Sequence, residues 1–132
     1  MDVKNKRVVV TGAASGIGKA LCEAFHQAKA QSVIAVDMNF DGAQDTADSV
    51  NGIAVQANVG NEKDIINVIE KADEHAGGTD IFCSNAGIGG VPGFFEVEAS
   101  DWQNIWDVNV QSHIFAAKHV LPQMIDRGEG YL

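Results

Sequence analysis

The sequence predicts an α/β fold in which an open, doubly wound parallel sheet is built from alternating strands and helices. Short β-branched or apolar runs typical of buried strands lie at residues 8–11, 32–36, 52–57 and 80–84. Helical patterns lie between these runs, and a glycine-rich turn at residues 12–18 joins the first strand to the first helix. Strands joined through helices pair in parallel with right-handed crossovers. We therefore expect one domain over residues 1–132.

Length, charge and cysteine content limit the class of protein. The chain has 132 residues, a net charge of −9 and a sequence pI near 4.6, which argue against nucleic acid or an anionic membrane surface as partner. It shows no transmembrane run and no apolar signal-peptide core, so we expect a cytoplasmic protein. Cys22 and Cys83 are expected to be buried thiols, and the four histidines have no metal-ligand spacing, so we expect no metal.

The first half of the chain contains two strand–helix units. The first helix is expected over residues 16–30, where apolar residues recur on one face. The second strand ends at Asp37, and a weak helix follows from residue 40 or 41. Asn51-Gly52 is a strong turn signal before the third strand.

The second half of the chain continues the alternation. Asn61 is expected to cap a helix that Gly77-Gly78 ends, and the fourth strand follows. The last helix is expected from Ser100 to Arg127, with a capping box between Ser100 and Gln103 and a kink at Pro122. Residues 130–132 are expected to begin a fifth strand.

The glycines after the first strand have physical roles in binding a dinucleotide. Gly12 allows a sharp turn off the strand, Gly16 allows the backbone to approach a pyrophosphate, and Gly18 allows the helix to pack closely. Free N–H groups at the helix N-terminus favour phosphate, and Ser15 is expected to cap the helix or bond a phosphate.

The segment TGAASGIG has the spacing G-x-x-x-G-x-G and resembles the nucleotide-binding loop of the short-chain dehydrogenase/reductase family. This resemblance implies that the loop, including Ile17, contacts the cofactor. Asp37 ends the second strand about twenty residues after the turn, where a carboxylate bonds the ribose hydroxyls of NAD. Because a carboxylate repels the 2′-phosphate of NADP and neither Met38 nor Asn39 is basic, we expect NAD as cofactor.

Two further segments extend the resemblance. Asn58-Val59 stands where the family commonly has Asp-Val, whose acid accepts a bond from the adenine amino group; Asn58 retains an amide oxygen as acceptor. Asn85-Ala86-Gly87 resembles the family's N-A-G motif. The resemblance implies that Asn85 ties strand ends together and that the two small residues leave room for the nicotinamide-side ribose.

Asn109 resembles the Asn of the family's catalytic tetrad, which holds a water that links the active-site lysine to solvent. The other members are a Ser and a Tyr-x-x-x-Lys pair, in which Lys lowers the Tyr pKa. The only tyrosine here is Tyr131, which lies too early for that position. The chain thus resembles the N-terminal half of a family member, and we expect it not to turn over substrate alone.

The resemblance implies a Rossmann-like sheet of strand order 3-2-1-4, truncated at the start of strand 5, with NAD across the carboxyl ends of strands 1 and 4. It implies NAD-dependent oxidation of an alcohol or reduction of a ketone. A non-catalytic NAD-binding module acting by association is the alternative, and a methyltransferase is a third possibility. Apolar residues on two sides of the helix over residues 101–127 predict a homodimer or homotetramer through that helix.

Overall fold

A computed structural model describes residues 2–89, 93 and 95–132. Within these residues, four parallel strands form one sheet in the predicted order β3-β2-β1-β4. The strands are β1 (Arg7–Thr11), β2 (Ser32–Asp37), β3 (Ile53–Gln56) and β4 (Ile81–Cys83). An isolated parallel bridge between Ile81 and Tyr131 extends the sheet beyond β4, as expected for the start of a fifth strand.

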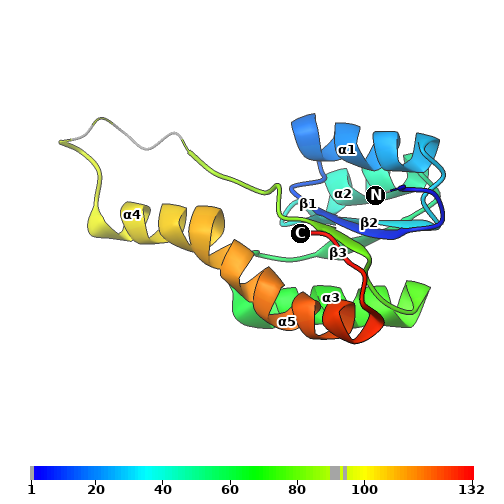
Figure 1. Ribbon diagram of the computed structural model, residues 1–132. Coiled ribbons are helices and arrows are strands. Elements are labelled where there is room, and N and C mark those ends of the chain that lie inside the picture. Colours follow the sequence, from blue (N-terminus) through cyan, green and yellow to red (C-terminus); the bar gives the residue numbers. More distant parts are fainter. Residues whose placement is uncertain (1, 90–92, 94) are drawn as a thin grey trace.

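Helices cover both faces of the sheet. Helices α1 (Gly16–Gln27) and α2 (Phe40–Ser49) lie on one face, and α3 (Glu62–Ala76) and α5 (Ser112–Arg127) lie on the other (Figure 1). Alternate strand residues face the two layers. Val8 and Val10 belong to one buried cluster, while Val9 and Phe82 belong to the other. Because helices cover both faces of the sheet, side chains on both faces of the strands are buried, and this explains the continuous apolar runs in the sequence.

The long C-terminal helix differs in two details from the prediction. Its first segment, α4 (Ala99–Trp106), is capped by Glu98, whose N–H donates to Asp101 Oδ2 at 2.9 Å. The predicted box between Ser100 and Gln103 is therefore wrong, because Gln103 Nε2 instead donates to Asp107 Oδ1 at 2.7 Å.

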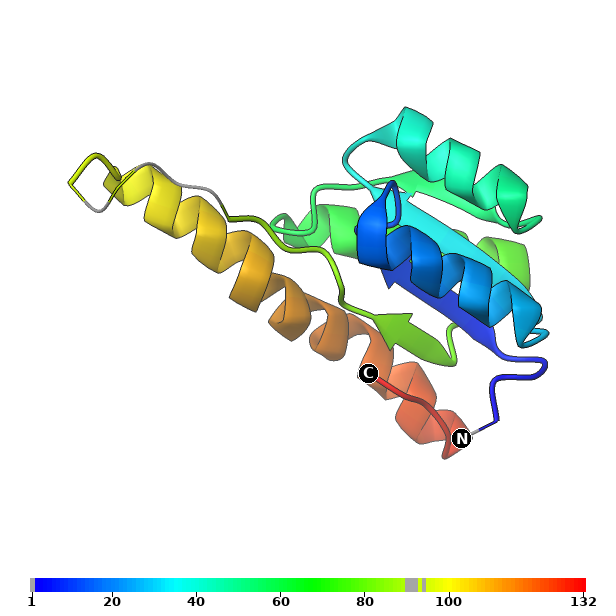
Figure 2. The ribbon, with the colours of Figure 1, turned by 90° about the horizontal axis from the view of Figure 1, so that it is seen from above.

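The other difference is the place where the helical pattern changes. A π-helical turn, η1 (Asp107–Gln111), separates α4 from α5, whereas Pro122 lies inside α5, which continues to Arg127. Gly128 ends α5 in the left-handed conformation, as predicted. Figure 2 shows α4 projecting beyond the sheet, in line with α5. No helix in the described part of the chain is long and apolar enough to cross a bilayer.

Charged side chains join the elements at the amino ends of β1 and β4. Arg7 Nε donates to Asp80 Oδ2 at 2.8 Å, and Arg127 Nη2 lies 3.5 Å from Asp80 Oδ1. The Asp80 side chain is only 9% exposed. Hydrogen bonds from Arg7 lower the pKa of Asp80 from 3.8 to about 2, so this carboxylate stays ionised near neutral pH. The cluster ties the end of α5 to the sheet.

Candidate dinucleotide site

The glycine-rich turn takes the shape that its glycines permit. Gly12 and Gly16 have φ angles of 71° and 55°, a region that favours glycine. A Cβ on Gly18 would overlap the Gly12 carbonyl oxygen, so α1 packs closely on the turn at the end of β1, in line with the close packing expected at Gly18. Ser15 is the N-cap residue of α1, but its side chain makes no capping hydrogen bond. The Ser15 hydroxyl therefore remains available to a ligand.

Thr11 and Asn85 fasten the carboxyl ends of β1 and β4 together. Asn85 Nδ2 donates to the Thr11 carbonyl oxygen at 2.9 Å, as its expected tying role requires. The buried Thr11 hydroxyl oxygen accepts hydrogen bonds from the N–H groups of Asn85 and Ala86, each at 3.0 Å. We did not predict this role for Thr11, although a hydroxyl residue directly before the turn was visible in the sequence. These bonds fix the main chain on which a ligand would rest.

Asp37 is held in place by main-chain donors. Its Oδ2 accepts a hydrogen bond from the Ala14 N–H at 3.0 Å, and its Oδ1 accepts one from the Asn39 N–H at 2.9 Å. A carboxylate oxygen can accept more than one hydrogen bond. The half-buried Asp37 therefore retains acceptor capacity at a fixed position beside the glycine-rich turn.

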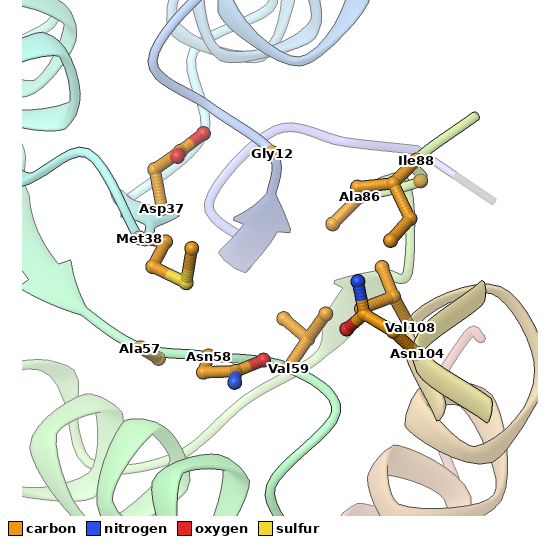
Figure 3. A pocket seen from close by; sticks show the side chains of 11 residues that line it. Gly12, Asp37, Met38, Ala57, Asn58, Val59, Ala86, Ile88, Asn104 and Val108 are labelled. Atoms are coloured by element: carbon orange, nitrogen blue, oxygen red, sulfur yellow. The ribbon is translucent and has the colours of Figure 1, made fainter. Parts of the chain in front are cut away.

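A cleft of about 210 Å³ opens between the ends of the strands and α4–η1 (Figure 3). Asp37 is the only ionisable residue among the described residues that line it. The lining comprises Gly12, Asp37, Met38, Ala57, Asn58, Val59, Ala86, Gly87, Ile88, Asn104 and Val108. Seven predicted residues are thus brought together at one cleft: Gly12, Asp37, Asn58, Val59, Ala86, Gly87 and, through its contact with Ile88, Asn109.

The remaining predicted residues lie next to this cleft rather than in its lining. Ser15, Gly16 and Ile17 surround the N-terminus of α1, and all three are exposed. A Cβ on Gly16 would meet no atom within 4 Å, so the space in front of the helix terminus is open. Gly18 and Asn85 support the turn from behind, where a Cβ on Gly18 would also come within 2.9 Å of Asn85 Nδ2.

Asn58 uses its amide oxygen inside the protein. The Gly60 N–H donates to Asn58 Oδ1 at 3.0 Å, so one of the two acceptor sites on the oxygen expected to serve a ligand is already occupied. The loop that carries Asn58 packs tightly on η1, since a Cβ on Gly60 would lie 3.2 Å from Asp107 Cβ. This contact closes one side of the cleft.

Asn109 lies in the π-helical turn and uses its whole carboxamide to hold the segment after β4. Its Nδ2 donates to the Ile88 carbonyl oxygen at 2.8 Å, and its Oδ1 accepts from the Ile88 N–H at 2.9 Å. We did not predict the π-helix, a feature that is frequent at functional sites. The water-holding role of Asn109 remains a prediction.

Five cleft residues were missed by sequence reasoning: Met38, Ala57, Ile88, Asn104 and Val108. They reach the cleft only through the packing of α4–η1 and of the segments after β2, β3 and β4, which no local pattern encodes. The two cysteines are free; Cys22 is buried and Cys83 is half-buried. Burial raises the pKa of Cys22 to about 12 and also raises that of Cys83, so both thiols stay protonated near neutral pH. The described residues include no cluster of three or more potential metal ligands.

The fold is that of an open parallel α/β domain, and its cleft lies beyond the carboxyl ends of the strands, where such domains bind ligands. A family model described as "short chain dehydrogenase" matches residues 6–132, and the chain belongs to this family.

Named relatives agree with this assignment. "Glucose 1-dehydrogenase 2" of Bacillus subtilis (strain 168) is 35% identical over 130 residues, covering 94% of this chain and 50% of the relative. "1-deoxy-11-beta-hydroxypentalenate dehydrogenase" of Streptomyces exfoliatus is 32% identical over 135 residues, covering 97% of this chain and 49% of the relative. The chain thus spans about half the length of these relatives.

A solved structure gives the same result for the fold. The crystal structure of a short-chain type dehydrogenase/reductase from Mycobacterium marinum superimposes with a TM-score of 0.87 at 30% sequence identity. The match covers 96% of this chain and 53% of that one.

Proposed function

We propose that this chain forms the NAD-binding part of a dehydrogenase that transfers hydride between NAD(H) and an alcohol or ketone. The observation that carries this proposal is the Asp37 carboxylate, fixed by two main-chain N–H groups at the edge of the cleft. The family assignment supports oxidoreductase chemistry. The nicotinamide, when bound, supplies the hydride acceptor or donor.

Asp37 favours NAD over NADP for two physical reasons. Its spare lone pairs accept hydrogen bonds from the adenosine ribose hydroxyls, whereas a 2′-phosphate at the same place would meet a negative charge. No lysine or arginine lies among the described lining residues to compensate that charge. Charge repulsion of this kind discriminates strongly between ligands of similar shape.

The other site residues have complementary roles in this proposal. The open space at Gly16 and the exposed N–H groups at the start of α1 suit a pyrophosphate, and the Ser15 hydroxyl is an additional donor. Ile17, at the same terminus, is 74% exposed and is available for apolar contact with the cofactor. Ala86 and Gly87 leave room for the nicotinamide-side ribose, and Asn109 positions the neighbouring Ile88 main chain.

The proposal includes the expectation that these 132 residues alone do not turn over substrate, because they contain no Tyr-x-x-x-Lys pair to move the proton. A non-catalytic NAD-binding module is less favoured, since the named relatives are dehydrogenases. Alcohol-dependent NADH formation by mass-verified chain would contradict the expectation. The cytoplasm is the proposed location.

A homodimer or homotetramer is the proposed assembly, with the helix over residues 101–127 as the contact. Several large apolar side chains lie exposed along it: Trp102, Trp106, Val110, Ile114 and Leu121. The opposite side, with Val108, Ala116 and Val120, is buried against the rest of the protein. Light scattering at micromolar concentration tests this proposal: Trp106→Glu should dissociate the oligomer, and a wild-type monomer would refute it.

The experiment for the cofactor is a comparison of NAD and NADP affinities by calorimetry. Asp37→Ala should shift the affinity ratio toward NADP by about 1–3 kcal/mol, because a charged hydrogen bond and a repulsion are both lost. Asp41→Ala is the matched control, since it removes an equal charge in the first turn of α2 without touching the cleft. An unchanged ratio in Asp37→Ala would show that this assignment is wrong.

A further inference from the structure

We propose that Asn104 is a specificity-determining residue that accepts a hydrogen bond from the 6-amino group of the cofactor's adenine. This inference rests on the proposed function, because it assumes that a dinucleotide occupies the cleft. It differs from the expected arrangement, in which residue 58 accepts that bond. Three features of the cleft carry it.

The first feature is the engaged oxygen of Asn58. An aspartate at position 58 would have a second carboxylate oxygen after one had bonded the Gly60 N–H. Asn58 has a single acceptor atom, one of whose two acceptor sites already receives that bond at 3.0 Å, and its remaining polar atom, Nδ2, is only a donor. Asn58 therefore offers the 6-amino group of adenine less acceptor capacity than an aspartate would.

The second feature is an unused carboxamide beside this loop. Asn104 lines the cleft, and its side chain makes no hydrogen bond with any described residue. It lies one helical turn before Val108, and the neighbouring Asp107 packs directly on Gly60. Figure 3 shows the Asn104 carboxamide between Val59 and Ile88. Asn85 and Asn109, in contrast, have their carboxamides bonded to main-chain groups.

The third feature is the chemistry of the surrounding surface. Ala57, Val59 and Val108 are buried apolar residues at the cleft, which suits the flat face of a heteroaromatic base. The Val59 N–H donates no hydrogen bond to any described residue, so a ring nitrogen of the base can accept from it. A main-chain donor and a side-chain acceptor on the same cleft match the ring nitrogen and amino group along one edge of adenine.

This arrangement predicts how the site should discriminate between adenine and a base that carries an oxygen in place of the 6-amino group. Asn104 itself can rotate its amide and donate to such an oxygen, whereas an aspartate accepts only. The Asn104→Asp variant should therefore retain adenine but reject the 6-oxo base. The readout is a ratio of two dissociation constants, so a general effect of the added charge on the cofactor phosphates cancels.

The experiment is calorimetric titration of the 132-residue chain with NAD and with nicotinamide hypoxanthine dinucleotide, its 6-oxo analogue. In Asn104→Asp, the Kd for the analogue relative to that for NAD should rise about tenfold. Asn61→Asp is the matched control: it adds the same charge near the cleft and keeps the capping acceptor of α3, so its ratio should stay within about twofold of wild type.

A second variant keeps the test decisive if Asn104→Asp fails to fold. Asn104→Ala should weaken NAD binding by about three- to tenfold, because it removes one hydrogen bond. An unchanged NAD affinity in Asn104→Ala, or equal ratios in Asn104→Asp and Asn61→Asp, would overturn the inference while leaving the proposed function intact. Absence of NAD binding by the wild-type chain would overturn the proposed function and, with it, this inference.

Discussion

The charged cluster at the amino ends of the sheet and the cleft at the carboxyl ends use polar side chains in opposite ways. At the amino ends, Arg7, Asp80 and Arg127 pair with one another and with main-chain carbonyl groups. At the carboxyl ends, Asp37 is held by main-chain donors and keeps lone pairs directed to no protein group, and Asn104 has no partner among the described residues. Polar groups that satisfy one another stabilise a fold, whereas groups that the protein leaves partly unsatisfied are available to a ligand.

Substitutions at the two ends of the sheet are therefore expected to affect different properties, stability at the amino ends and nucleotide binding at the carboxyl ends. Substitutions at the amino ends should lower the free energy of unfolding without altering nucleotide affinity. Substitutions of Asp37 or Asn104 should alter affinity with little effect on unfolding. Asn85 and Thr11 do not fit either group, because their hydrogen bonds both fasten β1 to β4 and shape the cleft.

The largest effect is expected for Asp80→Asn. Removing this charge leaves two arginines without their partly buried partner, and the free energy of unfolding should fall by about 2–4 kcal/mol. Urea unfolding followed by circular dichroism measures the loss. Glu129→Gln, which breaks an exposed pair with Lys6, should cost less than about 0.5 kcal/mol. A comparable loss in both variants would remove the distinction between the clustered and the exposed pair.

A smaller effect should appear on acidification. The pKa of Asp80 is lowered from 3.8 to about 2 in the folded protein, so the ionised carboxylate stabilises the fold fully above the unfolded-state value. That contribution, about 2 kcal/mol, is lost as the pH falls through roughly 4 to 2. The difference in unfolding free energy between wild type and Asp80→Asn should therefore narrow over this range. A difference that stays constant down to pH 2 would contradict the assigned cause.

Much of the fold follows from local patterns. The apolar runs and the glycine-rich turn predict the strands and the first helix because each is determined by residues adjacent in sequence, and the close approach at Gly18 follows from the same turn. The strand order was implied by the family resemblance. The π-helical turn at Asp107–Gln111 could not be predicted, since Asn109 is drawn to the Ile88 main chain by a contact 21 residues away. Glu98 was not predicted as the N-cap of α4, because in the sequence the pair Glu98 and Asp101 is no stronger a capping signal than the pair Ser100 and Gln103.

The candidate site likewise contains residues that the sequence predicts and residues that only tertiary packing brings there. Asp37 was predictable from its place at the end of a strand about twenty residues after the glycine-rich turn, and Asn85 from the resemblance of its segment to the family's N-A-G motif. Asn104 and Val108 were not, because they come from a helix whose position against the loop of Asn58 and Gly60 depends on tertiary packing. The engaged oxygen of Asn58 likewise depends on a main-chain turn that the sequence does not specify.

The most direct test of the account is an NMR titration of the ¹⁵N-labelled chain with NAD, because it reports on both ends of the sheet in one experiment. The account predicts that amide resonances at the carboxyl ends shift with NAD, among them those of Gly12, Ala14 and Val59, which surround the cleft and the turn. Resonances of Arg7, Asp80 and Arg127 at the amino ends should not move. Shifts confined to the amino ends, or no shift at millimolar NAD, would contradict the claim that the carboxyl-end cleft binds the cofactor.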